Sequence, residues 1–236
     1  DIRNAVEAMN SAKSWSHSTA HLRAQILYYL AENLSARTVE FTNNLQLLTG
    51  RADAQIEVEA SIQRLFFYAA WSDKFDGSAR SVPLKAIALV MNEAIGNCGV
   101  ICDDRYPLLG FISAMAPLFA TGNRSIIIPS EPFSPIVTDF YQVLDTSDVP
   151  PGTVNILTGR HTDLALELAS HMDIESVWSF STSDVSRDIE KASVSNLKRT
   201  WVSNGEKRDW YNEESQGIQF LTNSIENKTI WIPYGE

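Results

Sequence analysis

The sequence predicts an α/β fold built on a doubly wound parallel sheet, with helices before the sheet and short strands outside it. Two observations support this prediction. Up to about Trp71, apolar residues recur every three or four positions, which is typical of amphipathic helices. Between residues 98 and 202, short apolar runs alternate with helical segments. This alternation indicates βαβ units with right-handed crossovers and helices on both faces of the sheet.

The elements follow in order along the chain. Helical spacing within 22–34 and 62–69 predicts two or three helices in the first part of the chain. A turn at 76–78 leads to 84–93, whose strand-forming residues predict extended chain. We expect five sheet strands at 99–102, 125–128, 153–157, 177–180 and 197–202, with helices from about 107 and around 136–144, 162–170 and 185–192.

The composition changes after the fifth of these strands. Residues 204–217 are polar and charged, which predicts a solvated connection. The last stretch, 228–234, is typical of a β-strand. Pro233 within it indicates an edge strand, because proline cannot donate a hydrogen bond to a ladder.

Charge and composition exclude several classes of function. With 19 Lys+Arg against 29 Asp+Glu and a net charge of −10, the chain lacks the basic surface that binds nucleic acid or an anionic membrane. The longest apolar run, 108–120, is too short to span a bilayer. Two cysteines are too few for a disulfide framework, so we expect a reducing, cytoplasmic setting. Because the first residue is Asp1 and not Met, we expect a piece of a longer protein.

Few residues qualify as chemical sites on pattern alone. His17 and His21 could share a helix face, but no third ligand accompanies them, so no metal site is predicted. Cys98 and Cys102 lie in or beside a predicted strand and are interpreted as buried, inert thiols. The glycine fingerprint of dinucleotide-binding turns is absent. Pattern therefore predicts a fold class and no mechanism.

Six stretches carry a family pattern: FYAAWSDKFDG (67–77), NEAIGNCGVI (92–101), APLFATGN (116–123), VPPGTVNIL (149–157), ASHMDIESV (169–177) and NLKR (196–199). Their order and spacing over residues 2–207 resemble the aldehyde dehydrogenase superfamily. The resemblance implies a Rossmann-like nucleotide-binding fold and a β-arm used in oligomerisation. The implied parts are N-terminal helices at 1–80, the arm at 81–97, the Rossmann-like domain at 98–207, a linker replacing the catalytic domain at 208–227, and a terminal strand at 228–236 that pairs with the arm.

The sequence departs from the family at its chemical positions. The family's Pro-Trp-Asn-Phe-Pro motif, whose Asn helps stabilise the oxyanion, is represented by 103–107, with Arg105 in place of Asn. Two adjacent carboxylates would compete for this arginine and oppose a developing negative charge. Ile128 stands where the family has the lysine that holds the adenosine ribose, whereas the nearby Glu131 is retained.

Two further motifs are altered. The Phe-Thr-Gly-Ser turn that cradles the pyrophosphate becomes 179–182, where Ser181 replaces the glycine and Thr182 retains a hydroxyl. At 202–207, Ser203 replaces the glutamate that serves as general base, and serine cannot accept a proton at neutral pH in that role. No cysteine matches the family's nucleophile, so no catalytic residue is assigned. The cofactor-binding candidates are Glu131 and Thr182.

These departures suggest a noncatalytic module that resembles the second, degenerate module of the two-module, family 16 type of aldehyde dehydrogenase. Its expected role is assembly, through the arm, with the other module of its own chain and with a second copy in a homo-oligomer such as a dimer. No cofactor or metal is expected.

Two alternatives stay open. The first is residual NAD(P) binding or a regulatory role within an aldehyde-oxidising oxidoreductase, with Arg105 as a new anion contact. Each lost contact would weaken such binding by ~1 to 3 kcal/mol. The second is a protein-partner epitope at the acidic residues 209–214, although such charge runs usually form solvated faces.

Overall fold

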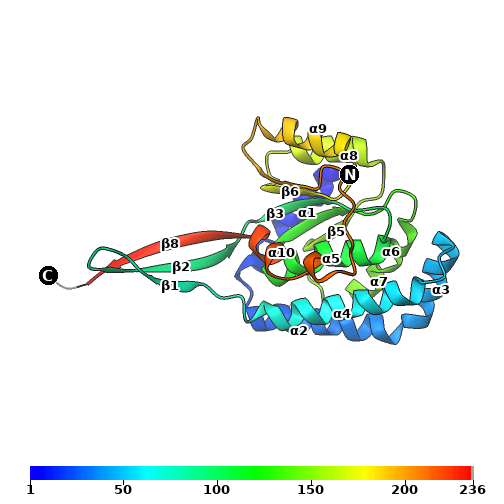
Figure 1. Ribbon diagram of the computed structural model, residues 1–236, viewed down its shortest axis with the longest axis horizontal. Helices are drawn as coiled ribbons and strands as arrows, with labels where there is room; N and C mark the ends of the chain where they lie inside the picture. Colours follow the sequence, from blue (N-terminus) through cyan, green and yellow to red (C-terminus); the bar gives the residue numbers. More distant parts are fainter. Residues whose placement is uncertain (235–236) are drawn as a thin grey trace.

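A five-stranded parallel sheet organises most of the chain, and a three-stranded antiparallel arm projects from it (Figure 1). The computed structural model describes residues 1–234, so the last two residues of the predicted 228–236 strand lie outside the described part. The parallel strands are β3 (Asn97–Ile101), β4 (Arg124–Ile128), β5 (Val154–Ile156), β6 (Ser176–Ser179) and β7 (Arg199–Val202). Their spatial order is β5-β4-β3-β6-β7, which confirms the predicted doubly wound fold.

Helices cover both faces of this sheet (Figure 1). Before the sheet come α1 (Ile2–Ser11), η1 (Lys13–His17), α2 (Ala20–Ala36), α3 (Thr38–Thr49) and α4 (Ala54–Ser72). Between its strands lie α5 (Pro107–Ala120), α6 (Pro135–Asp139), α7 (Tyr141–Asp145), α8 (His161–Ser170) and α9 (Ser183–Ser193). The single helix predicted at 136–144 is thus two short helices that meet at Phe140.

Strand alternation divides the core into two layers. Ile127 of β4 packs with α2, α4 and α5, whereas its neighbours Ile126 and Ile128 pack with α1, α8 and α9. Successive side chains of a strand point to opposite faces, so a run of isoleucines serves both layers. All residues of α5 are buried, which makes it the central helix of the larger layer.

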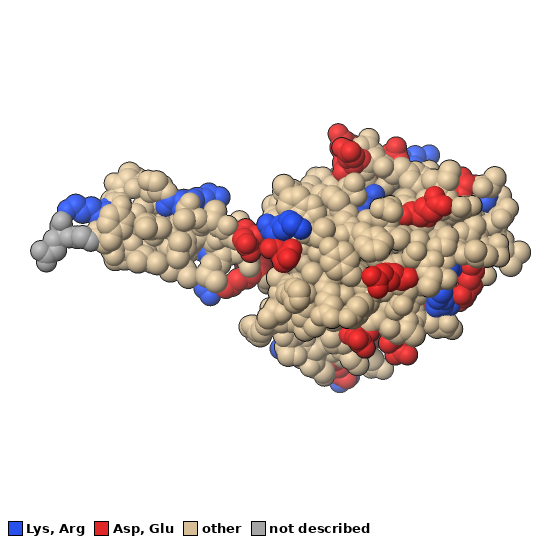
Figure 2. All heavy atoms as spheres, turned by 90° about the horizontal axis from the view of Figure 1, so that it is seen from below, with Lys and Arg blue, Asp and Glu red and all other residues tan. Residues whose placement is uncertain are grey.

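The arm is built from β1 (Ser78–Ser81), β2 (Ala86–Ala94) and β8 (Ile225–Pro233). β2 lies in the middle and pairs with β8 from Ala86 opposite Pro233 to Ala94 opposite Ile225. Most of the arm surface seen in Figure 2 consists of uncharged residues. The C-terminal strand begins at Ile225, earlier than the predicted 228.

The predicted solvated connection at 204–217 is exposed over most of its length, but Trp210 and Ser215 within it are buried. It contains η2 (Glu213–Ser215), and just beyond it α10 (Ile218–Asn223) buries Phe220 and Leu221. The Trp210 ring lies 5.1 Å from that of Phe180 at the end of β6. Trp210 stands alone among polar residues and Phe220 is followed directly by Leu221, so no apolar periodicity marked 203–224 as a docked segment.

The helices of the described chain include none with both the length and the apolar character needed to cross a membrane.

Replacing Trp210 with alanine should lower the free energy of unfolding by about 3 to 5 kcal/mol, because it leaves a large cavity beside Phe180. The measurement is urea denaturation followed by circular dichroism. Leu47→Ala is the control, since Leu47 on α3 is 86% exposed and lies outside the arm, and it should cost under about 1 kcal/mol. Equal losses in the two variants would contradict the docked connection.

Candidate functional site

The candidate site lies at the carboxyl ends of the parallel strands. β4 and β6 flank β3, so the chain reverses direction across the sheet at β3, and ligands of doubly wound folds bind beside such a point. The loops that follow these strands surround a cavity of about 280 Å³. It is lined by Asp103, Asp104, Arg105, Phe180, Ser181, Thr182, Gly205, Glu206 and Lys207. We call this cavity the crevice.

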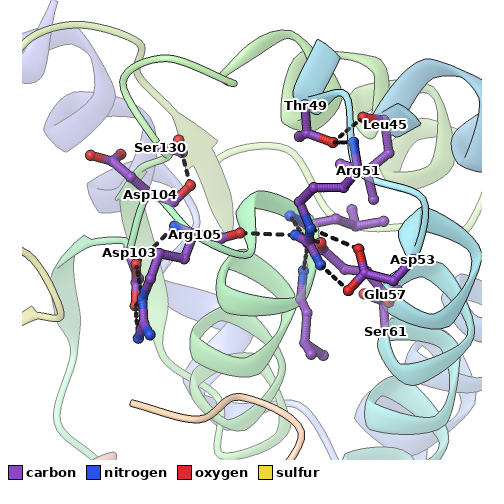
Figure 3. Close-up of polar contacts among 12 residues, drawn as sticks. Leu45, Thr49, Arg51, Asp53, Glu57, Ser61, Asp103, Asp104, Arg105 and Ser130 are labelled. Carbon is purple, nitrogen blue, oxygen red and sulfur yellow. Dashed lines mark hydrogen bonds and ion pairs between the residues drawn. The ribbon is translucent and has the colours of Figure 1, made fainter. Parts of the chain in front are cut away.

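The loop after β3 is held by its own side chains. Asp103, which is buried, accepts hydrogen bonds from Arg105 N (2.8 Å) and from Trp210 Nε1 (3.2 Å). Arg105 Nη2 lies 2.9 Å from Asp103 Oδ2 and donates to the backbone oxygen of Arg208 at 2.6 Å. The Arg105 guanidinium is therefore directed at an internal carboxylate (Figure 3).

The buried carboxylate of Glu57 helps to fix the loop after β3 (Figure 3). Glu57 on α4 is fully buried, and its Oε1 accepts from Leu108 N (3.0 Å) and Leu109 N (3.2 Å) at the start of α5. Its Oε2 lies 2.7 Å from Arg51 Nη1, which also donates to Arg105 O. A negative charge is favourable at a helix N-terminus, where N–H groups lack intrahelical partners.

Opposing influences act on Glu57. Burial raises the pKa of its carboxyl above the ordinary value, and the Leu109 and Leu108 N–H groups and Arg51 oppose that rise. Arg51 also pairs with Asp53 at 2.8 Å and lies over the Tyr106 ring, 4.5 Å from its centroid. The network joins α3, α4 and α5 to the loop after β3.

Thr182, one of the two predicted cofactor residues, lines the crevice. It is the N-cap of α9, and its Oγ1 accepts from Val185 N at 3.4 Å. The turn after β7 packs against the same helix start: Gly205 has a φ of 79°, and a Cβ placed there would lie 3.0 Å from Ser183 N. The protein backbone thus narrows the approach to the α9 N-terminus, where an anion would otherwise be favoured.

Glu131, the other predicted residue, is held outside the crevice. Its backbone N donates to Asp104 Oδ1 at 2.9 Å, and its carboxylate accepts from His161 N at the start of α8. It is not among the residues that line the crevice. The structure therefore does not bring Glu131 and Thr182 to one cavity.

His161 lies between these two positions, and sequence reasoning gave it no role. Its side chain is buried, and Nε2 is 2.8 Å from the Pro129 carbonyl oxygen, which can only accept. Nε2 therefore carries a proton, and Nδ1 is hydrogen-bonded to Ser181 Oγ at 3.0 Å. The imidazole bridges the ends of β4 and β6. The sequence offered one indication that His161 lies near the site: it is the first residue of a helix that follows a strand.

The charges around the crevice disfavour a phosphate. Asp103, Asp104 and Glu206 line it against the two cations Arg105 and Lys207. Because Arg105 is already paired with Asp103, a pyrophosphate would meet unbalanced carboxylates.

The groups available for catalysis are likewise limited. At the end of β7, Ser203 Oγ donates a long hydrogen bond to Ser181 O, at 3.4 Å. Cys98 and Cys102 are free and buried, and burial raises the pKa of both thiols, which keeps them protonated. Within residues 1–234, no cluster of three or more His, Cys, Asp or Glu could hold a metal ion.

Comparison with known proteins identifies the family. The aldehyde dehydrogenase family model matches residues 1–211. The chain belongs to the aldehyde dehydrogenase family. Its relatives include omega-crystallin of Enteroctopus dofleini, 31% identical over 207 residues, and an aldehyde dehydrogenase of Davidiella tassiana, 29% identical over 243 residues. These alignments cover 84% and 100% of this chain but 42% and 47% of the relatives, so the chain spans less than half their length.

Solved structures show the same fold. PnpE from Pseudomonas sp. WBC-3 superposes with a TM-score of 0.82 at 27% identity, over 86% of this chain and 42% of PnpE. A second PnpE structure, in complex with nicotinamide adenine dinucleotide, also gives a TM-score of 0.82. The family resemblance of the sequence is confirmed.

Substituting Glu57→Gln should destabilise this aldehyde dehydrogenase family fold by about 2 to 4 kcal/mol, because an amide presents only one acceptor oxygen to Leu108, Leu109 and Arg51. Thermal and urea unfolding measure the change. In the control Glu40→Gln, the side chain is 49% exposed and its pair with Arg37 should be worth under about 1 kcal/mol. If both variants unfold like the parent chain, Glu57 does not anchor the loop.

Proposed function

We propose that the chain is a noncatalytic aldehyde dehydrogenase-like module that contributes to the assembly of a larger, two-module protein. The observation that carries this proposal is the short connection between the last strand of the parallel sheet, β7, and the arm strand β8. Residues 203–224 alone separate β7 from β8, and their aromatic side chains are packed into the core. The catalytic domain expected from the resemblance would have to be inserted within this docked segment.

The residues in and around the crevice support the proposal that the module is noncatalytic. Ser203 occupies the position of the general base, and both cysteines are buried with raised pKa values. Asp103 holds Arg105 away from the oxyanion role. Without an activated nucleophile there is no covalent intermediate, and the ordinary family reaction has no starting point within these residues.

The arm supports the assembly part. Among the described strands, β8 pairs on one side only, with β2. Apolar side chains on β2 and β8 are about half exposed: Ile87, Met91, Trp231 and Ile232. An open strand edge with exposed apolar side chains is a template for a further strand. We propose the other module of the same chain and a second copy as the partners.

The arm can be tested by sedimentation velocity. The double variant Ile230→Lys, Ile232→Lys places two charges on β8 and should shift the chain from oligomer to monomer. Leu47→Lys with Leu166→Lys is the control, since those side chains are exposed on helices of the body. A mass distribution that is the same in the arm variant, the control and the parent chain would contradict association through the arm.

A second candidate function is residual NAD(P) binding, which one observation favours. Thr182 still lines the crevice at the N-terminus of α9, and PnpE, a relative of similar fold, has been solved with the dinucleotide. The assembly proposal, in contrast, expects that the crevice does not bind a dinucleotide. The His161 to Ser181 hydrogen bond and the turn at Gly205 would have to yield before a pyrophosphate could reach α9.

Calorimetric titration with oxidised nicotinamide dinucleotide separates the two candidates. We expect no saturable heat up to millimolar concentration, because several lost contacts of ~1 to 3 kcal/mol each move a micromolar site beyond that range. Thr182→Ala serves as the control for any heat observed. Micromolar binding that Thr182→Ala abolishes would support the nucleotide-binding function instead.

A further inference from the structure

A second cavity adjoins the crevice and shares Phe180, Glu206 and Lys207 with it. Its volume is about 450 Å³, larger than that of the crevice. The remaining lining residues come from the end of β7 and from the docked segment after it, including Trp201, Arg208 and Gln219. We call this the Arg208 cavity.

The guanidinium of Arg208 packs against a cluster of aromatic rings. Its guanidinium carbon is 5.4 to 5.8 Å from the centroids of four rings: Phe180, Trp201, Trp210 and Phe220. Trp201 also lines the cavity, so an aromatic face and a cation are presented to it together. Stacked guanidinium groups keep their in-plane N–H donors available for a planar anion.

The donors of Arg208 are largely unused. In the described chain its side chain donates one hydrogen bond, from Nη1 to Glu214 O at 3.2 Å, and Nε is buried without a partner. None of the ion pairs within residues 1–234 includes Arg208. Burial lowers the pKa of Arg208, and the nearby carboxylates of Glu214 and Glu206 partly oppose that fall without forming an ion pair.

Comparison with Arg64 shows that a buried arginine of this chain can have its hydrogen-bond donors satisfied within the protein. Its buried guanidinium donates to Ser113, Ser215 and Trp210, all neutral acceptors that satisfy it within the protein. Arg208 has no comparable set of acceptors and faces a cavity instead. A guanidinium with several free donors, partly removed from water, favours an anion that enters from outside.

We propose that the Arg208 cavity binds a small aromatic monocarboxylate, with the guanidinium holding the carboxylate and Trp201 contacting the ring. The charges of the lining define the ligand class. Glu206, Asp209 and Glu214 line the cavity with Lys207 and Arg208, so three carboxylates stand against two cations. A phosphate or dicarboxylate would meet this excess of negative charge, whereas a single carboxylate can be matched by Arg208.

The test is calorimetric titration of the full chain with benzoate and with benzamide, its neutral analogue of the same shape. Benzoate should bind saturably, and benzamide at least about tenfold more weakly, because benzamide has no negative charge and only one acceptor oxygen for the guanidinium. Tryptophan fluorescence, recorded in parallel, should change with benzoate in the parent chain and respond less in Trp201→Phe. This comparison needs no variant of Arg208, so it decides the proposal even if such variants unfold.

Arg208→Gln should weaken benzoate binding at least about tenfold, and Arg208→Lys should restore it only in part, since an ammonium cannot form the bidentate pair. Arg187→Gln is the matched control, because Arg187 is exposed on α9 and pairs with Asp184. Equal affinity for benzoate and benzamide, undiminished binding by a folded Arg208→Gln chain, or no saturable benzoate binding would each overturn the proposal. None of these outcomes bears on assembly through the arm, which is tested separately.

Discussion

The architecture depends on how Arg64 of α4 is buried. Arg64 is 4% exposed, and its guanidinium donates to Ser113 on α5 and to the backbone oxygens of Trp210 and Ser215. Burial among these neutral acceptors lowers its pKa to about 10. The three bonds tie the segment between β7 and β8 onto the central helix. Because that segment is tied down, the chain runs along the core between the end of the sheet and the start of the arm.

The docked segment also completes an aromatic cluster at the edge of the sheet. Trp178 and Trp201 from neighbouring strands lie 4.9 Å apart, and Phe220 of α10 lies 4.8 Å from Trp201. Large rings left open at the carboxyl end of β7 would form an exposed apolar patch, which a soluble fold disfavours. Trp210 and Phe220 cover these rings.

The sheet was predictable because its signal is local. Alternating apolar runs such as 125–128 and the helical spacing between them specify strands and crossovers without any knowledge of tertiary contacts. The docked segment was missed because its apolar residues have no period and are held by Arg64, which is distant in the sequence. The same limit applies at the site. The resemblance pointed to Thr182. The hydrogen bond between His161 and Ser181, however, joins two separate βα turns, so no local sequence pattern could predict it.

Fold and ligand chemistry depend on different parts of the strands. Side chains within β3, β4 and β6 form the core, and Cys102 and Phe180 extend it just beyond two strand ends, whereas the polar residues of the following turns lie outside it. Residues of the turns beyond the strand ends also bond to one another. Trp210 Nε1 donates to Asp103, and Ser181 is hydrogen-bonded to His161. A cofactor entering the crevice would have to break such bonds before making its own contacts, so the interactions that stabilise this region also oppose the binding of a dinucleotide.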